Sequence, residues 1–185
     1  RNEIRYIMGK MQKQTGNVNY CYHVGQYLPD WHPWESYEDF FVREKETNGC
    51  RELFAIELPW LIKTFGEIES IKVLAGNSTS LKISYYDNYL TLIQHKTGHK
   101  GMLAIDIVSR KAVRNLEIFG EEMYITWDGV PAGLKEYDFR KKEERVVKLY
   151  DSVDSIKGYE AFIVENAYEN ELRKFFNEIE CDDKS

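Results

Sequence analysis

Residues 80–108 read SLKISYYDNYLTLIQHKTGHKGMLAIDIV, and this stretch decides the fold class of the chain. It contains three runs rich in β-branched, aromatic and aliphatic residues, which are typical of strands: 80–86, 89–95 and 102–108. Short polar segments with turn-forming residues separate these runs. Because no helical pattern lies between them, we expect them to pair as antiparallel strands.

The strand pattern extends on both sides of this stretch. Further runs of the same kind are residues 17–24, 70–75, 112–118, 123–127, 134–139 and 145–149. Within 80–86, the apolar residues Leu81, Ile83 and Tyr85 alternate with more polar ones. The sheet should therefore have one apolar face, which other elements must cover.

Helical patterns lie outside the strand region. Residues 10–16 read as the end of a short helix, 34–43 as a short helix, and 51–65 as a densely apolar helix that Pro59 interrupts. Residues 159–179 carry apolar side chains at helical spacing and are expected to cover part of the sheet. We predict an α+β fold: a large, mostly antiparallel sheet with helices packed on one face, as a single domain over residues 1–185.

Composition and charge exclude several classes of function. With 185 residues, 43% of them hydrophobic, the chain can form a substantial core. Its 31 acidic and 25 basic residues are spread along the sequence, so no nucleic-acid surface is predicted. No apolar run is long enough to cross a membrane, and no signal sequence is recognisable. Three widely separated cysteines fit a reducing compartment, so we expect a cytoplasmic protein without a membrane partner.

A second informative segment, residues 25–37, reads GQYLPDWHPWESY. Pro29 and Pro33 favour a stiff connection over a helix or a central strand, and such a connection can hold side chains at the edge of a pocket. The aromatic residues on both sides of His32 can stack on sugar rings or on planes like that of nicotinamide. A purely structural hydrogen bond is the alternative for His32.

Motifs of self-sufficient catalysis are absent from the sequence. It contains no glycine-rich dinucleotide or phosphate loop, no metalloprotease motif and no nucleophile elbow. His95 and His99 could share a metal only on a helix, which Gly98 disfavours, so no metal site is predicted. A free-standing hydrolase with Asp30 and Glu35 as paired carboxylates is one alternative, although acids at such positions also cap helices.

At residues 25–37 the sequence resembles the carboxy-terminal domain of the glucose-fructose oxidoreductase, inositol dehydrogenase and MocA family (Gfo/Idh/MocA). The segment is similar to the substrate-side loop of a sugar-related branch of that family. The similarity continues through residues 48–52, the following helix, the strands and residues 167–176. It covers nearly the whole chain, and the first segment is its most specific part.

The resemblance implies one half of an enzyme. Members of the family bind NAD or NADP in an amino-terminal Rossmann domain that also supplies a catalytic lysine, while their carboxy-terminal sheet contacts substrate and builds the oligomer. Neither the Rossmann fingerprint nor the motif of that lysine occurs here, and the sequence opens at Arg1 without a methionine. We therefore expect a fragment of a longer two-domain chain that alone binds no cofactor and does not catalyse. A processed or disordered start is the alternative explanation of the opening.

One pair of positions departs from the family pattern. Members commonly carry an aspartate followed four residues later by a histidine, and the matching positions here hold Glu52 and Ile56. Glu52 can move a proton or position a substrate, whereas Ile56 cannot replace an imidazole. Either His32 supplies the acid–base group or the chain has lost the usual chemistry. With a shifted alignment, Glu57 would face the site instead.

Two functions from different classes follow. The first is the substrate-binding and oligomerisation domain of an NAD(P)-dependent oxidoreductase that acts on a sugar, sugar nucleotide or related polyol. The second is a non-catalytic ligand-binding or assembly module that forms a homo-oligomer through the sheet face.

Under the first function, the predicted catalytic residues are His32 and Glu52. The predicted substrate-binding residues are Tyr27, Trp31, Trp34, Glu35, Tyr37 and Arg51. Each has a structural alternative: Tyr27 and Trp34 can belong to the core, and Arg51 can pair with Glu52 or a neighbouring acid.

Overall fold

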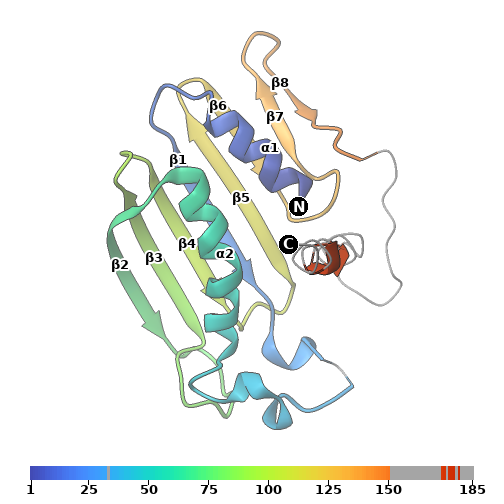
Figure 1. The fold of residues 1–185 in the computed structure, drawn as a ribbon. Coiled ribbons are helices and arrows are strands. Elements are labelled where there is room, and N and C mark those ends of the chain that lie inside the picture. Colours follow the sequence, from blue (N-terminus) through green and yellow to red (C-terminus); the bar gives the residue numbers. More distant parts are fainter. Residues whose placement is uncertain (33, 151–171, 174, 178, 180–185) are drawn as a thin grey trace.

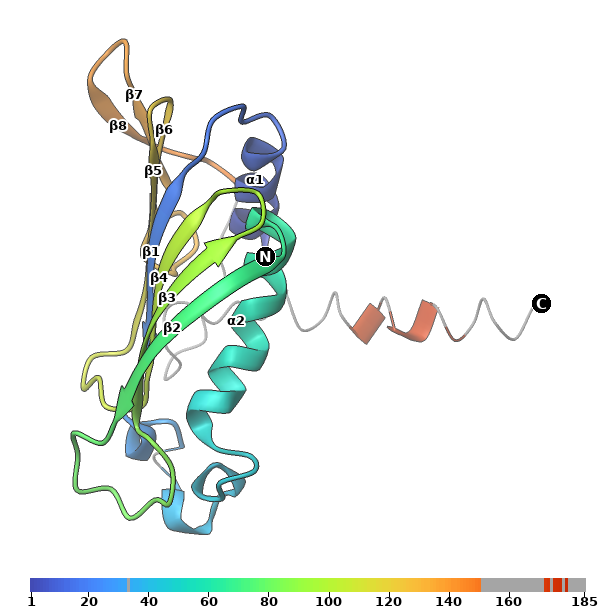
Figure 2. The same cartoon turned by 90° about the vertical axis from the view of Figure 1, so that its left-hand side faces the viewer.

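The computed structural model describes residues 1–32, 34–150, 172–173, 175–177 and 179. They form one eight-stranded sheet with two α-helices on one of its faces (Figure 1). Figure 2 shows this as two layers seen edge-on. The predicted α+β class with a large, mostly antiparallel sheet is confirmed. Neither of these helices has the length and apolar character needed to cross a bilayer.

The elements follow one another in this order along the chain. The helices are α1 (Asn2–Met11) and α2 (Gly49–Phe65), with short 3-10 turns at Leu28–Asp30, Tyr37–Asp39 and Phe41–Arg43. The strands are β1 (Asn19–Gly25), β2 (Ile68–Gly76), β3 (Asn88–His95), β4 (Lys100–Asp106), β5 (Val113–Gly120), β6 (Met123–Trp127), β7 (Lys135–Asp138) and β8 (Glu143–Val146).

Strand β1 breaks the simple meander. The order across the sheet is β2-β3-β4-β1-β5-β6-β7-β8, and β1 pairs parallel to β4 and antiparallel to β5. The prediction that all strands pair antiparallel with their neighbours in sequence is therefore wrong at β4 and β5. The turn residues between these two strands gave no sign that a strand from the start of the chain lies between them.

The two helices cover one face of the sheet and close the core. α2 begins at the cap residue Asn48, whose side chain accepts a hydrogen bond from the backbone of Arg51 at 2.7 Å, and it continues through Pro59 without ending. The core between helices and sheet is mostly apolar but also contains the buried carboxylate of Glu57, and its largest buried side chains include Trp127, Tyr20, Tyr22, Phe65, Ile105 and Ile118.

Two predicted elements are absent. Residues 34–43 form two 3-10 turns rather than a helix, because the Ser36 hydroxyl accepts a bond from the backbone of Glu38 and Phe40 adopts an extended backbone. Residues 80–86 form no strand, although Leu81, Ile83 and Tyr85 are more buried than the residues between them. Tyr85 instead donates a hydrogen bond to the carbonyl of Val42 at 2.5 Å and draws this loop onto the core.

The helix predicted over residues 159–179 lies mostly outside the described residues. Those that are described there are helical. Their apolar side chains are about half exposed and do not cover the sheet: Leu172, Phe175, Phe176 and Ile179.

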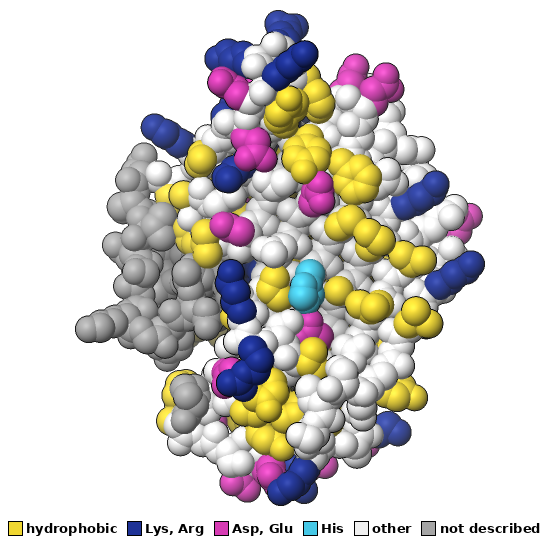
Figure 3. Space-filling view, turned by 180° about the vertical axis from the view of Figure 1, so that it is seen from behind, with side chains coloured by type: hydrophobic (Ala, Val, Ile, Leu, Met, Phe, Trp, Pro, Cys, Tyr) yellow, Lys and Arg dark blue, Asp and Glu magenta, His cyan; other side chains and the backbone are white. Residues whose placement is uncertain are grey.

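The sheet face opposite α1 and α2, here called the open face, carries exposed apolar side chains (Figure 3). The register places Leu92, Met102 and Cys21 in one row of this face, between Lys72 and Glu117. A second row joins Leu74, Leu90, Ala104, His23 and Asn115. Both rows lie in a broad hollow of about 960 Å³.

Asp87 fixes the loop between β2 and β3. Its carboxylate accepts hydrogen bonds from the backbone N–H groups of Ser78 and Thr79 and from the Thr79 hydroxyl, at 2.7–3.0 Å. Burial alone would raise the pKa of this carboxyl, but the hydrogen bonds from Thr79, Ser78 and Asn88 hold it below its usual value. The ionised carboxylate therefore stabilises the native loop.

We expect Asp87→Asn to lower the free energy of unfolding by about 1–3 kcal/mol at neutral pH, because an amide accepts fewer and weaker hydrogen bonds. A lowered native pKa means that the contribution of Asp87 is complete above the ordinary aspartate range and is lost as the pH falls through the lowered value. Urea unfolding at about pH 7 and about pH 3 tests this. A stability difference that is equal at both pH values would contradict it.

Candidate functional site

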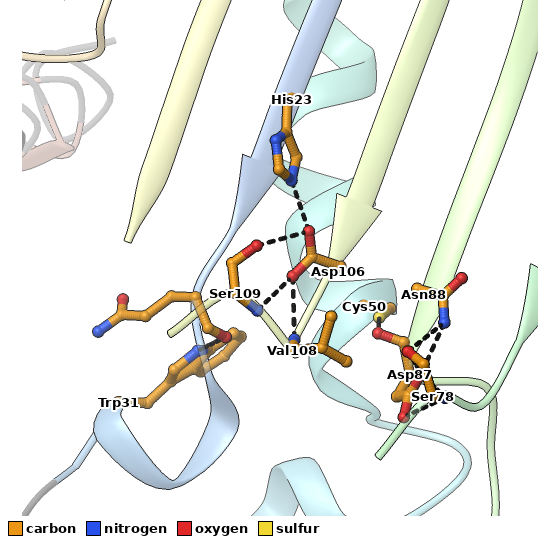
Figure 4. A network of polar contacts seen from close by, with 10 residues as sticks. His23, Trp31, Cys50, Ser78, Asp87, Asn88, Asp106, Val108 and Ser109 are labelled. Carbon is orange, nitrogen blue, oxygen red and sulfur yellow. Dashed lines mark hydrogen bonds and ion pairs between the residues drawn. The ribbon is translucent and has the colours of Figure 1, made fainter. Parts of the chain in front are cut away.

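The chain leaves β1 at one end of the sheet and is fixed there by the backbone. Tyr27 donates its N–H to the carbonyl of Ser109 at 2.7 Å, and Leu28 donates to that of Ile107 at 3.0 Å. The Trp31 indole N–H donates to the carbonyl of Gln26 at 3.0 Å (Figure 4). The predicted stiff segment thus holds the Trp31 ring against the end of β1.

A cavity of about 130 Å³ lies at this end of the sheet. Its lining comes from the end of β1, the start of β5 and the first turn of α2: Val24, Gly25, Gln26, Trp31, Glu52, Leu53, Val113 and Arg114. Trp31 and Glu52, both predicted as site residues, are brought together here by elements distant in sequence.

Glu52 has the properties of a proton-transfer group. Its Oε2 atom is buried and has no hydrogen-bond partner among the described residues. Burial raises the pKa of its carboxyl, and the nearby His32 opposes that rise. A carboxyl with a raised pKa that lines a cavity is suited to exchange a proton with a bound hydroxyl group.

His32 lies among carboxylates and aromatic rings. Its Nδ1 atom is 2.6 Å from Oε1 of Glu35. Its ring stacks on Trp34 at a centroid distance of 5.0 Å and contacts Phe40 at 4.1 Å. Trp34 is 69% exposed, so it does not belong to the core. This group presents an aromatic surface on which a sugar face could stack.

The remaining predicted site residues make other contacts. Tyr27 lies under the guanidinium of Arg110, 4.2 Å from its ring centroid. The Tyr37 hydroxyl accepts the N–H of Lys82 at 3.1 Å. The Arg51 guanidinium donates to the carbonyl of Glu46 at 2.7 Å, a contact other than the predicted pair with Glu52. None of Tyr27, Tyr37 and Arg51 lines the cavity.

Glu57 belongs to α2, on the side of the helix that faces the sheet, and is fully buried. Its Oε2 atom accepts hydrogen bonds from the Tyr22 hydroxyl and the Trp60 indole, both at 2.7 Å. Its Oε1 atom is 2.8 Å from Nη1 of Arg114. Glu57 is therefore not among the residues that line the cavity, and Ile56, 51% exposed, lies on the outer surface of α2.

Arg114 is the site residue that sequence reasoning missed. It lines the cavity with Glu52 and is only 8% exposed. Its sequence signal was weak, because Arg114 stands beside the polar residues Asn115 and Glu117 in a strand of mixed composition. Such a residue is usually solvated, and its buried partner Glu57 lies 57 positions away, beyond the reach of local patterns.

The structure gives no joint environment to Asp30 and Glu35. Asp30 pairs with Arg110 at 3.6 Å, whereas Glu35 pairs with His32. Among the described residues, no group of three or more histidine, cysteine, aspartate or glutamate side chains is arranged to hold a metal ion.

Comparison with known proteins identifies the class of fold. No protein-family model matches the sequence, and no curated protein matches it. The structure, however, shares its fold with the carboxy-terminal part of NAD-dependent sugar dehydrogenases of the Gfo/Idh/MocA type. The fold implied by the sequence resemblance is thereby confirmed.

Three solved structures illustrate the match. Levoglucosan dehydrogenase in complex with NADH is 12% identical with a TM-score of 0.63, over 80% of this chain and 44% of that one. An oxidoreductase from Agrobacterium radiobacter in complex with NAD+, L-tartaric acid and magnesium is 12% identical with a TM-score of 0.67, over 88% of this chain and 47% of that one. The WlbA dehydrogenase from Bordetella pertussis in complex with NADH and UDP-GlcNAcA is 12% identical with a TM-score of 0.56, over 68% of this chain and 39% of that one. The chain spans less than half the length of each of these proteins.

Proposed function

We propose that this chain is the substrate-binding domain of an NAD(P)-dependent oxidoreductase that acts on a sugar, sugar nucleotide or related polyol. The observation that carries the proposal is the cavity at the end of β1, which joins Glu52 and the Trp31 ring. A carboxyl with a buried, unpartnered oxygen is suited to accept a hydroxyl proton, and a neighbouring aromatic ring is suited to a sugar face. In this proposal, Glu52 and His32 carry the acid–base chemistry.

The proposal places the hydride carrier in another part of the protein. A Rossmann domain preceding this chain would bind NAD or NADP and supply the lysine, because no dinucleotide loop occurs in the sequence. His32, Trp34 and Glu35 would then form the rim between the two domains. Alone, the chain would not catalyse, and we expect the whole protein in the cytoplasm.

Titration of the 15N-labelled chain, followed by NMR, tests the proposal. The probes are levoglucosan and UDP-N-acetylglucosamine. Two proteins of similar structure are named for them, levoglucosan dehydrogenase and UDP-N-acetylglucosamine 3-dehydrogenase. We expect saturable shifts of the Gln26 amide, the Trp31 indole N–H and the Glu52 amide with at least one probe. Glu52→Ala or His32→Ala should weaken binding about tenfold or more, since each removes a hydrogen bond to the ligand.

Glu67→Ala is the matched control, because this exposed carboxylate lies just after the far end of α2 and pairs with Lys96. Binding should be unchanged in this variant. No shift with either probe at millimolar concentration would contradict the proposed site. Saturable binding of NADH by the isolated chain would contradict the assignment of the cofactor to another domain.

We propose as a second function that the open face joins two copies of this chain. Leu74, Leu90, Leu92 and Met102 are each more than half exposed there, and adjacent strands bring them into one patch. An exposed apolar patch of this kind is unfavourable in water, and a second copy that covers it is therefore favoured. This function is compatible with the first, because the substrate cavity lies outside that hollow.

The charges at the two ends of the open face favour a second copy as the occupant. Lys72 lies on β2 at one edge of the sheet, and Glu144, 3.6 Å from Lys135 of its own chain, lies on β8 at the other. A two-fold axis along the strands at the centre of the sheet would bring β2 of one copy over β8 of the other. The opposite charges would then approach each other twice in the same dimer.

A further inference from the structure

A histidine and a carboxylate lie together in the open face. His23 is on β1, the fourth strand of eight, and the register places it between Ala104 and Asn115. Its Nε2 atom is 2.5 Å from Oδ2 of Asp106, and its side chain is 41% exposed. Figure 3 shows a histidine near the middle of this face, between apolar side chains. The pair therefore lies where a second copy would cover it.

The fold holds the Asp106 carboxylate in its ionised form. Oδ1 accepts the backbone N–H groups of Val108 and Ser109 at 2.9 and 2.8 Å, and Oδ2 accepts the Ser109 hydroxyl at 3.0 Å (Figure 4). Burial alone would raise the pKa of this carboxyl, but the hydrogen bonds from His23, Val108 and Ser109 hold it below its usual value.

The neighbouring Gly25 makes room for this carboxylate. A Cβ atom at Gly25 would lie 2.4 Å from Oδ2 of Asp106, so a larger residue would displace it. The absence of a side chain at Gly25 therefore allows Asp106 to lie beside His23.

Other charged or titratable groups also line the hollow. They come from five of its bordering strands and one loop: Cys21 on β1, Lys72 on β2, Glu117 on β5, Tyr124 on β6, Asp128 after β6, and Lys135 on β7. Burial raises the pKa of the Cys21 thiol, and a hydrogen bond to Glu117 raises that of Tyr124, so both stay neutral. Histidine is the residue type that ordinarily changes charge between pH 5 and 8, and His23 is the histidine in this lining.

We propose that association of two copies through the open face takes up protons at His23 and therefore strengthens as the pH falls from 8 to 6. The inference rests on the second function proposed above. With a neutral imidazole, the pair carries the negative charge of Asp106; with a protonated imidazole, it carries no net charge. Because two such pairs lose water and approach each other in the dimer, the neutral form of the pair is favoured there.

Sedimentation equilibrium of the wild-type chain and His23→Gln at pH 8 and pH 6 tests the proposal. Glutamine can still donate to Asp106 but does not titrate. We expect the wild-type dissociation constant to fall about tenfold over this range, which corresponds to an average uptake of about a quarter of a proton on each copy. In His23→Gln the dissociation constant should change by less than about twofold over the same pH range. General effects of the falling net charge act equally on both proteins, so the ratio isolates His23.

Two outcomes would contradict the proposal, and they are distinguishable. A monomer at every pH would overturn both the interface and this inference. Association with the same pH dependence in His23→Gln would overturn the inference and leave the interface standing. Asp106→Asn supplies an independent check, because without the carboxylate the protonated imidazole is unpaired and association should weaken rather than strengthen at pH 6.

Discussion

Glu57→Ala is expected to lower the free energy of unfolding by about 3–5 kcal/mol, because it leaves the charge of Arg114 buried without its carboxylate. Glu57 is fully buried and Arg114 is 8% exposed. The substitution also removes the acceptor of the Tyr22 hydroxyl and the Trp60 indole. Urea unfolding followed by tryptophan fluorescence measures the loss.

Two further variants separate the contributions of charge and shape. The double substitution Glu57→Met with Arg114→Met should recover much of the loss, because a packed apolar pair replaces the buried ion pair. Lys96→Ala removes the exposed ion pair with Glu67 and should leave stability unchanged within error. If Glu57→Ala changed the free energy of unfolding as little as Lys96→Ala, the buried ion pair would not contribute measurably to stability.

Leu92→Asp is expected to weaken self-association at least a hundredfold, about 3 kcal/mol, by placing an unpaired charge within the covered face. Leu92 is 54% exposed in the single chain, so the stability of the monomer should change little. Sedimentation equilibrium gives the dissociation constant, and thermal unfolding at low concentration checks the monomer.

Ile71→Asp is the matched control for Leu92→Asp. Ile71 is 53% exposed on the neighbouring strand β2 but pairs with the buried Ile93, which places it on the helix side of the sheet. Association should persist in this variant. If both substitutions abolished association, the interface would involve the β2 edge rather than the open face.

Local patterns predicted most of the strands correctly, because period-two alternation and turn residues act within a few positions. The runs that became β3, β6 and the core of β2 are examples. The loop 80–86 shows the limit: its alternation reflects burial of Tyr85 against the core rather than membership of the sheet. A burial pattern alone does not reveal whether the backbone finds a partner strand.

The candidate site was predicted in part for the same reason. Trp31 was selected from the aromatic segment around it and Glu52 from the family resemblance, and the structure places both on one cavity. Arg114 was missed because its position depends on how β5 lies beneath α2. The assignment of Glu57 to the core likewise required the helix orientation, since shifting a helix by one residue turns each side chain by about 100°.

The central place of β1 has a consequence for how the chain folds during synthesis. β1 emerges first among the strands, yet Val18 at its start bonds to His99, 81 positions later, and β1 itself pairs with β4 and β5. Contacts so distant along the chain close slowly, because a long loop must be ordered before they form. On the ribosome, β1 must therefore wait, unpaired, until β4 has been translated as far as Asp106. Fragments ending before that residue lack the middle of their own sheet and depend on chaperones to stay free of aggregates.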